Sequence, residues 1–241
     1  MNDEFEGERG DPLDTSEQSV RGRFTGLPTT GAGRRASLKF VLRVLPMLVR
    51  GGANKPFLAA SRGLLLVGRR VRFSDRSYIR HTGRLVLEDG VEIQGLSRQG
   101  LTFGFNVSIG AGTMIRPSSY YGGTVGEGLI VGDRSSMGAS CFVGCSGLIV
   151  IGNDVMLGPG VRIFSENHRF DSENTTIKSQ GVERGTVTIG DNCWIASGVT
   201  ITTNVRIGDG VVIGAGSVVT KDIPAYSIAA GSPARVIRSR K

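Results

Sequence analysis

Aliphatic residues recur every six positions along the C-terminal part of the chain. They stand at Ile189, Ile195, Ile201, Ile207, Ile213 and Val219. The residue four places beyond each of the first five is small or β-branched. An α-helix repeats every 3.6 residues and a strand every two, so neither sustains a strict period of six. The pattern predicts a coil in which each hexad supplies one short strand and one turn.

The same step continues towards the N-terminus and is broken only by insertions. Its earlier members are Phe73 and Ile79; Leu87 and Ile93; Phe103, Ile109 and Ile115; Val131, Met137 and Val143; Ile151, Leu157 and Ile163. Three hexads would close one turn of a triangular solenoid, with the aliphatic side chains stacked inward. Glycine, Asn or Asp would occupy the corners, where a positive φ costs little. The predicted fold class is therefore mainly β, a parallel β-helix.

The ends of the chain follow other patterns. Residues 1–33 are polar and acidic, which predicts a disordered tail. Residues 34–70 form a basic and apolar segment, of which 34–50 should be a helix kinked near Pro46. This helix either caps the coil or lies on an anionic membrane surface, and we favour the cap. The coil should span residues 71–225, followed by a basic segment at 226–241.

Two long breaks in the register predict loops on one face of the coil, where solenoids often bind ligands. The first insertion, between Ile115 and Val131, exceeds one hexad by ten residues. The second, between Ile163 and Ile189, exceeds it by twenty and contains His168. We therefore expect the functional site near these loops.

Composition supports many tight turns and suggests the kind of partner. Glycine contributes 37 of 241 residues, about twice the usual share of ~7%. Residues 1–20 carry a net charge of −6 and the whole chain +8, so residues 21–241 carry +14. A basic body suits nucleic acid, anionic lipid or a phosphorylated small molecule. Only 6% of residues are aromatic and no nucleic-acid-binding motif is visible, so nucleic acid is not expected as a partner.

Cysteine and histidine usage favours a cytoplasmic protein without a metal. An odd cysteine number in a chain of this length indicates reduced thiols, and the three are Cys141, Cys145 and Cys193. Only two histidines, His81 and His168, are present, so no metal site is expected. The acidic N-terminus does not look like a secretory signal, and no run of 18 apolar residues occurs. Membrane association would then depend on residues 34–50.

Four motifs carry a family resemblance over residues 73–241. They are SENHRFD at 165–171, IGDNCWIASGV at 189–199, IGAGSVVTKDIP at 213–224 and AAGSPARVIR at 229–238. In this order they resemble the hexapeptide-repeat acyltransferases, most closely the O-acetyltransferases of exopolysaccharide, lipopolysaccharide and colanic-acid biosynthesis. The resemblance implies a left-handed parallel β-helix, a homotrimer with active sites between subunits, and acetyl-CoA or another acyl-CoA as co-substrate rather than a permanently bound cofactor.

The resemblance assigns His168 as the catalytic base. Acyl transfer from a thioester to a hydroxyl needs a base within reach of the acceptor, and imidazole titrates near neutral pH. His168 would deprotonate a sugar hydroxyl, which then attacks the thioester directly, without an acyl-enzyme. Asn167 and Glu166 flank the base, and Asn167 is a second catalytic candidate.

The donor side is also assigned by resemblance. The residues matching the family's acyl-CoA contacts are Trp194, Ser197, Ala215, Thr220, Lys221, Arg235 and Arg238. The first three would line the groove for pantetheine, and Thr220 and Lys221 would lie near adenosine. Arg235 and Arg238 would meet the phosphates, which suit the guanidinium fork.

The acceptor side departs from the family pattern. Where galactoside and maltose acetyltransferases have an Asn and an Asp that contact the acceptor, the register places Gly138 and Ser146. The acceptor site therefore differs, so galactosides or maltose cannot be assumed, and the candidate residues for binding the acceptor are Glu166, Asp171, Arg116, Tyr120 and Tyr121.

Three hypotheses for the function stay open. The first is an O-acetyltransferase acting on a sugar of a polysaccharide or glycolipid precursor. The second is an N-acyltransferase on an aminosugar, or an enzyme that uses a longer acyl chain. The third is a non-catalytic β-helix scaffold, or a zinc carbonic anhydrase of similar coil, which would need three histidines.

Overall fold

The computed structural model describes residues 31–117 and 124–240, with the backbone alone for residues 31–41. The acidic tail predicted at residues 1–33 lies almost wholly outside this range, and so do Tyr120 and Tyr121. The chain divides into two units, residues 1–45 and 46–241, and the second contains the coil. The helix α2 (Gly31–Asn54) crosses the division and continues through Pro46.

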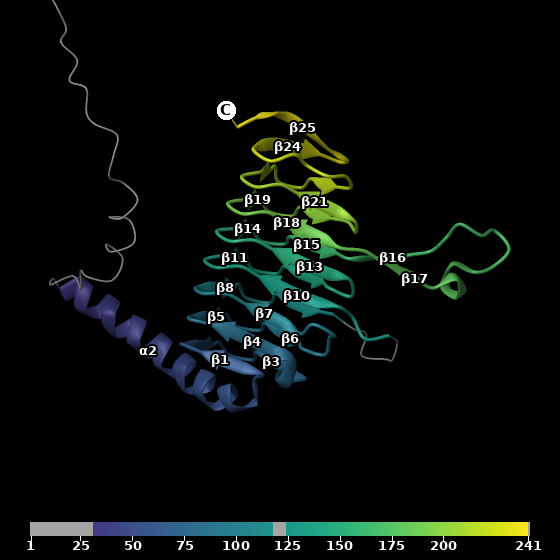
Figure 1. Cartoon of the computed structure of the whole chain (residues 1–241). Helices are drawn as coiled ribbons and strands as arrows, with labels where there is room; N and C mark the ends of the chain where they lie inside the picture. Colours follow the sequence, from purple (N-terminus) through teal and green to yellow (C-terminus); the bar gives the residue numbers. More distant parts are fainter. Residues whose placement is uncertain (1–30, 118–123, 241) are drawn as a thin grey trace, which may run out of the picture. The chain divides into compact units, whose positions relative to one another are not determined.

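Three sheets, here called A, B and C, make the coil (Figure 1). Sheet A contains β1 (Ala60–Arg62), β4 (Ile79–Thr82), β7 (Leu101–Phe103), β10 (Gly128–Val131), β13 (Leu148–Ile151), β18 (Val187–Ile189) and β21 (Val205–Ile207). Sheet B contains β2 (Leu65–Val67), β5 (Leu85–Leu87), β8 (Val107–Ile109), β11 (Ser136–Met137), β14 (Met156–Leu157), β19 (Trp194–Ile195), β22 (Val212–Ile213), β24 (Ser227–Gly231) and β25 (Ala234–Ser239). Sheet C contains β3 (Arg72–Ser74), β6 (Glu92–Gln94), β9 (Met114–Arg116), β12 (Phe142–Gly144), β15 (Arg162–Phe164), β20 (Thr200–Ile201) and β23 (Val218–Val219).

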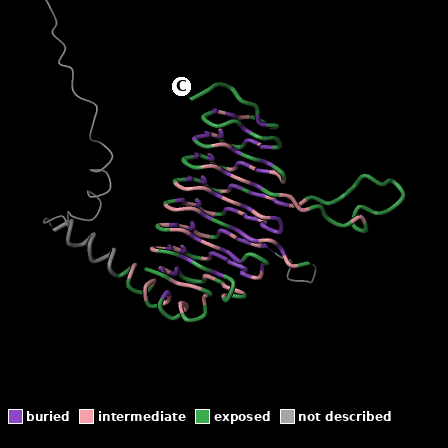
Figure 2. Tube along the Cα trace, viewed as in Figure 1, coloured by how far each residue is buried: buried purple, intermediate pink, exposed green. Residues whose placement is uncertain are grey.

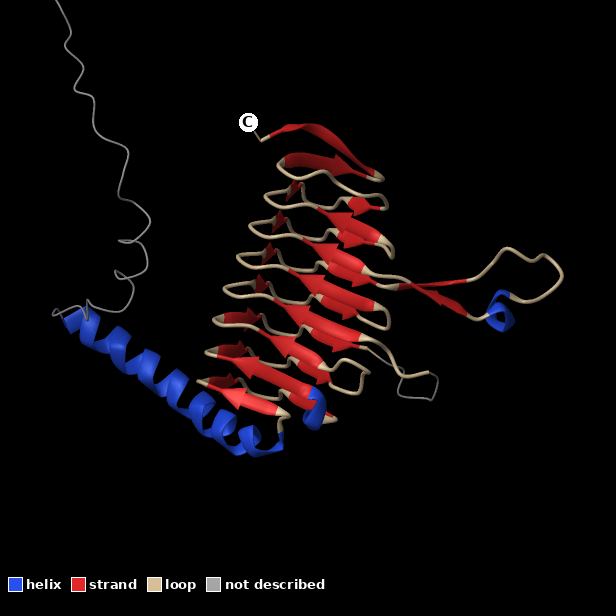
Figure 3. Ribbon diagram, viewed as in Figure 1, coloured by secondary structure: helices blue, strands red, loops and turns tan. Residues whose placement is uncertain are grey.

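The chain passes from sheet A to B to C and returns to A one coil further on, as Figure 3 shows. All pairings in these sheets are parallel except that of β25 with β24. Within the described residues, short 3₁₀ helices occur at Lys55–Phe57, Arg76–Tyr78 and Ile177–Gln180. The predicted mainly β fold, a parallel β-helix, is confirmed.

The six-residue period places one aliphatic side chain per sheet in the interior. Ile189, Ile195 and Ile201 lie in sheets A, B and C of one coil, and each is at most 1% exposed. The next coil repeats the arrangement, since Ile207 pairs with Ile189 and Ile213 with Ile195. Full burial of such a side chain contributes about 1.5–3 kcal/mol, and the stacked ladders form one continuous core (Figure 2).

The corners have the backbone geometry that the sequence predicts. Asn192 and Asn204 have φ values of 55° and 58°, in the left-handed region that Asn tolerates better than most residues. Glycine meets a different requirement where coils approach closely. A Cβ atom on Gly152 would lie 2.3 Å from Oδ1 of Asp191 and 2.8 Å from the carbonyl carbon of Gly190. Larger residues there would push neighbouring coils apart.

The coil extends beyond both boundaries that the sequence suggested. The helical segment expected over 34–70 ends at Asn54, and the strands of the coil begin at Ala60. Val67 stands six residues before Phe73, so the hexad step already covers this region. At the other end, β24 within the expected basic segment adds a strand to sheet B beside β22. Its buried Ala229 pairs with Ile213, which gives the last coil an apolar neighbour.

The C-terminal end of α2 packs on the first strand of sheet B. Gly51 is buried, and a Cβ atom there would lie 1.7 Å from the carbonyl oxygen of Leu65. The Nε atom of Arg50 donates a 2.8 Å hydrogen bond to the carbonyl oxygen of Val67. This end of the helix therefore lies against the edge of the coil. In the described part of the chain, no helix is long and apolar enough to cross a membrane.

Candidate active site

A hairpin carries His168 away from the coil. It consists of β16 (Glu166–His168) and β17 (Val182–Arg184), which pair antiparallel and place His168 opposite Val182. The hairpin leaves the coil after β15 of sheet C and returns into β18 of sheet A (Figure 1). The second insertion is thus an extended arm at the corner between sheets C and A.

The side chains near the tip of this hairpin face solvent. His168, Asn167 and Asp171 are exposed, and Glu166 is half-buried. Among the described residues, no hydrogen bond joins the imidazole of His168 to Glu166 or Asn167. The imidazole is therefore accessible to a ligand, and no residue in the described part of the chain hydrogen-bonds to either ring nitrogen.

The root of the hairpin is anchored by contacts that the sequence did not reveal. The buried Ser165 hydroxyl donates to the carbonyl oxygen of Gly144 at 2.7 Å and accepts from the amide of Gly147 at 2.8 Å. The guanidinium of Arg184 donates to the carbonyl oxygens of Thr124 and Val125, at 2.7 and 2.8 Å. These contacts span 18 to 60 residues of sequence, so neither period nor motif could indicate them.

Arg116, an acceptor candidate, is held by a buried carboxylate. Its Nε and Nη2 atoms donate to Oε1 of Glu92 at 2.9 and 2.6 Å. Arg72 donates to the other oxygen of Glu92 at 2.5 Å, and the Glu92 side chain is only 5% exposed. Glu92 was absent from the predicted site because it occupies an ordinary strand position. Arg116 therefore lies at the foot of the first insertion and is oriented by this ion pair.

The two positions that depart from the sugar-acetyltransferase pattern lie at different corners. Gly138 follows β11 at the corner between sheets B and C. Ser146 follows β12 at the corner between sheets C and A, where its buried hydroxyl oxygen has no hydrogen-bond partner among the residues described. The amide of Glu127 donates to the carbonyl oxygen of Ser146 at 2.9 Å, so the returning first insertion covers this residue.

The residues expected to line the pantetheine groove gather on one side of the coil. Trp194 is 51% exposed on sheet B, between Met156 and Val212 in the strand register. Ser197 and Ala215 are exposed at the corner between sheets B and C, on successive coils. Trp194 therefore offers an exposed ring on sheet B, and Ser197 and Ala215 add small side chains at the corner towards sheet C.

The remaining donor-side residues occupy two places. Arg235 and Arg238 are exposed on β25, the last strand of sheet B. Thr220 and Lys221 are exposed just after β23, at the corner between sheets C and A. The arginines therefore share a sheet with Trp194, whereas Thr220 and Lys221 share a corner with the hairpin.

Within one chain, the predicted base and the predicted groove lie on different sides. The hairpin leaves at the corner between sheets C and A, which is the corner opposite sheet B. Sheet C separates this corner from Ser197 and Ala215. The groove and the hairpin of a single chain therefore face different directions.

The cysteines offer neither a nucleophile nor a metal site. Cys141, Cys145 and Cys193 are all buried and free. Burial raises the pKa of each thiol, which keeps the sulfur protonated. No group of three or more potential metal ligands occurs in the described part of the chain.

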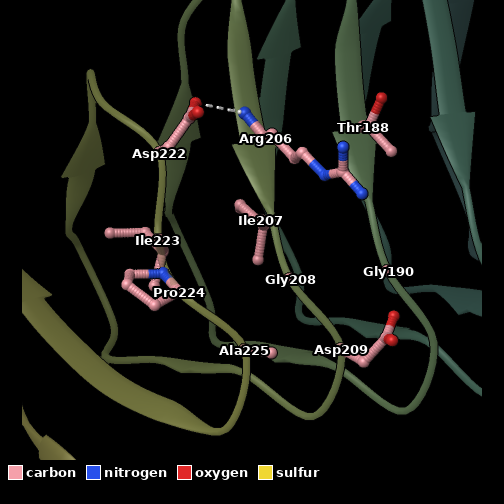
Figure 4. A pocket seen from close by; sticks show the side chains of 10 residues that line it. All are labelled: Thr188, Gly190, Arg206, Ile207, Gly208, Asp209, Asp222, Ile223, Pro224 and Ala225. Carbon is pink, nitrogen blue, oxygen red and sulfur yellow. Dashed lines mark hydrogen bonds between the residues drawn. The ribbon is translucent and has the colours of Figure 1, made fainter.

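An open pocket of about 500 Å³ lies on the outer side of sheet A (Figure 4). The pocket is lined by Thr188, Gly190, Arg206, Ile207, Gly208, Asp209, Asp222, Ile223, Pro224 and Ala225. The Arg206 side chain points towards Thr188, and the amide of Arg206 donates to Oδ1 of Asp222 at 2.7 Å. None of the predicted site residues that the structure describes lines this pocket.

Comparison with known proteins identifies the family. Residues 186–221 match the family described as bacterial transferase hexapeptide (six repeats). The chain is 34% identical over 136 residues to the putative colanic acid biosynthesis acetyltransferase WcaF of Escherichia coli. This match covers 56% of the chain and 71% of the relative. The chain belongs to the hexapeptide-repeat transferase family.

Other members of this family show how far the similarity extends. Galactoside O-acetyltransferase of Escherichia coli is 35% identical over 131 residues, which cover 54% of the chain and 63% of the relative. A putative acetyltransferase of Schizosaccharomyces pombe is 49% identical over 92 residues, which cover 38% of the chain and 43% of the relative. The chain thus spans about half the length of several relatives that it matches.

A solved structure shares the hexapeptide-repeat fold. It is a mutant of AntD, an N-acyltransferase from Bacillus cereus, in complex with dTDP-4-amino-4,6-dideoxyglucose and coenzyme A. The two chains are 17% identical and superimpose with a TM-score of 0.53 over 80% of this chain and 89% of the other. At this identity the likeness concerns the fold.

Proposed function

We propose that the protein is an acyl-CoA-dependent O-acyltransferase that transfers acetyl to a sugar hydroxyl of a polysaccharide or glycolipid precursor. The observation that carries this proposal is the accessible imidazole of His168 on a hairpin beside the coil. Family membership supports it, because the relatives at 34 and 35% identity are named as acetyltransferases, one of them for galactosides. A scaffold would have no need for such an exposed histidine arm.

The proposed reaction is a direct transfer with His168 as the general base. The imidazole takes the proton of the sugar hydroxyl while the hydroxyl oxygen forms a bond to the thioester carbonyl carbon. The carbon–sulfur bond then breaks, and the imidazolium returns the proton to the departing thiolate of CoA. The buried and protonated state of the three cysteines argues against an acyl-cysteine intermediate. Asn167 flanks the base and is proposed to help orient either it or the acceptor.

Acetyl-CoA acts as a co-substrate that binds along sheet B. The exposed ring of Trp194 offers an apolar wall, and the small side chains of Ser197 and Ala215 leave room for the pantetheine arm. Arg235 and Arg238 supply positive charge for the phosphates. Thr220 and Lys221 would meet the adenosine end from the other corner.

Because the base and the groove face different sides of one chain, we infer that neighbouring subunits of a homotrimer complete each site. One subunit would contribute the hairpin, and the next would contribute sheet B. The protein would work in the cytoplasm, where acyl-CoA is available. Its basic helix would bring it to an anionic membrane surface that carries a glycolipid acceptor.

The first prediction tests the base. Thiol release from acetyl-CoA is followed with a panel of hexoses, aminohexoses and nucleotide-linked hexoses, for wild type and His168→Ala. We expect His168→Ala to lower kcat by about 10²–10⁴-fold with little change in the KM for acetyl-CoA, as for loss of a general base.

Lys178→Ala serves as the matched control, because Lys178 is exposed in the 3₁₀ helix of the same hairpin. Turnover that survives His168→Ala would rule out this mechanism. A preference for amino groups over hydroxyls would favour N-acylation instead, and a complete lack of turnover with every acceptor would favour the scaffold.

A further inference from the structure

The two insertions emerge from the same corner of the coil. The first follows β9 and the second follows β15, and both lead from sheet C into sheet A. Only the coil of β12 lies between them, since Gly144 pairs with Arg116 on one side and with Phe164 on the other. Segments far apart in sequence therefore meet at one place.

Arg184 joins the two insertions. It stands opposite Glu166 at the root of the hairpin. Its Nη1 and Nη2 atoms donate to the carbonyl oxygens of Val125 and Thr124, in the returning arm of the first insertion. Its Nε atom is buried, makes no hydrogen bond to the residues that the structure describes, and lies 3.9 Å from Oε2 of Glu166. The side chain is 23% exposed; its contact with Val125 is partly buried, and its contact with Thr124 is open to solvent.

The position of His168 depends on such contacts because little else supports the hairpin. Residues 167–179 are exposed throughout. Ser165 fixes the root to the intermediate coil through Gly144 and Gly147. Arg184 adds a second attachment to the first insertion, two residues along the strand pairing from the imidazole. Two attachments in different directions define the angle at which the hairpin leaves the coil.

From this geometry we propose that Arg184 is a positioning residue, which locks the His168 hairpin to Thr124 and Val125 and so fixes where the imidazole meets the acceptor hydroxyl. This inference rests on the proposed function of His168. The planar guanidinium suits the task because it presents two parallel donors to two successive carbonyl oxygens. A single ammonium group would reach one of them.

The test combines kinetics with hydrogen exchange. Arg184→Met keeps the aliphatic stem and removes the donors, and Arg184→Lys keeps the charge. We expect Arg184→Met to lower kcat by about 10²-fold, the order found when a reacting group is displaced by about 1 Å, with an unchanged KM for acetyl-CoA. Arg184→Lys should recover part of this loss. The acceptor is the panel sugar that gives the fastest turnover with the wild type.

Arg162→Met is the matched control, since Arg162 is an exposed arginine on β15, the strand before the hairpin. It should retain wild-type kinetics. Amide exchange at residues 166–184 should quicken in Arg184→Met and stay as in the wild type in Arg162→Met. Unchanged exchange in Arg184→Met would overturn the proposal, because the hairpin would then be held by other contacts.

A double variant separates positioning from general stabilisation. If Arg184 acts through His168, the variant His168→Ala/Arg184→Met should be no slower than His168→Ala alone. Losses that multiply would overturn the proposal. If His168→Ala is fully active, the general-base mechanism is wrong. If His168→Ala is inactive but Arg184→Met has wild-type kinetics, only the positioning role of Arg184 is wrong, so the two failures can be told apart. Should Arg184→Met not fold, the same comparisons apply to Arg184→Lys.

Discussion

At the scale of single residues, His81 is the clearest case of a polar group enclosed by the coil. It lies on β4 with 1% exposure, and its Nε2 atom is 2.5 Å from the hydroxyl oxygen of Ser61. Burial lowers the pKa of His81 below its ordinary value of 6.5. The imidazole is therefore neutral in the folded protein at neutral pH and accessible to protons mainly after unfolding.

This burial predicts a pH-dependent contribution to stability. The unfolded chain binds the proton at a higher pH than the folded chain, so the free energy of unfolding should fall as pH drops below about 6.5. Each unit of lowered pKa corresponds to about 1.4 kcal/mol. Urea unfolding of wild type and His81→Gln at pH 8 and pH 5 measures the effect. The difference in free energy of unfolding between wild type and His81→Gln should be smaller at pH 5 than at pH 8. A difference that does not change with pH would contradict the expectation.

The sequence proposes roles for residues within a motif, whereas it gives no sign of those defined by a tertiary contact. His168 and Trp194 stand within the SENHRFD and IGDNCWIASGV segments, and both side chains are exposed. Arg184 is one of many basic residues in a +8 chain, and its partners are backbone carbonyls 59 and 60 residues away. Glu92 is equally unmarked, because its burial depends on two arginines from neighbouring coils.

At the scale of elements, α2 has apolar residues on two sides. Gly51 packs against Leu65 at the edge of the coil. Leu42, Leu45 and Val49 follow one another at helical spacing, and each is more than half exposed. The helix carries five basic residues and no acidic one. A membrane with anionic headgroups matches this combination of an exposed apolar row and positive charge.

Vesicle co-sedimentation tests the membrane contact. The full chain should bind vesicles that contain phosphatidylserine and bind pure phosphatidylcholine vesicles weakly. Leu45→Asp/Val49→Asp should weaken binding by at least about tenfold, because burial of one such side chain is worth about 1.5–3 kcal/mol. Ile177→Asp is the control, since Ile177 is equally exposed but lies in the hairpin. Equal vesicle binding by all three proteins would show that α2 does not contact the membrane. If the wild type self-associates without lipid and Leu45→Asp/Val49→Asp does not, a second copy of the chain would be the partner of the exposed apolar row.

The elements themselves were largely predictable, with errors where the periodic signal weakens. The hexad step located every coil from Phe73 onward because one aliphatic per sheet suffices to build the core. The sequence did not predict the first coil, because its strands follow closely on an apolar helix and only Val67 continues the six-residue period there. At the C-terminus β25 runs antiparallel to β24, so a six-residue period cannot report it.

At the scale of the whole molecule, the three-sided coil separates the two groups that the proposed reaction would bring together. His168 leaves at the corner between sheets C and A, and Trp194 lies on sheet B. In the proposed homotrimer, the hairpin of one subunit would lie against sheet B of the next, so every site would take one part from each of two chains. The oligomer would then be a requirement for catalysis rather than an addition to stability.

Mixed assembly tests this arrangement. His168→Ala removes the base, and Ala215→Glu places a bulky negative side chain at an exposed position of the proposed groove, so each variant alone should be inactive. Co-assembled in equal amounts as random trimers, the two should regain about a quarter of wild-type kcat per chain, because a quarter of sites pair an intact hairpin with an intact groove from the neighbour. If base and groove belonged to the same chain, every chain would carry one defect and mixing would restore nothing. As a control, the two variants are assembled separately and then mixed, and activity is measured before and after their subunits exchange. Activity that rises only after exchange would assign each site to two subunits.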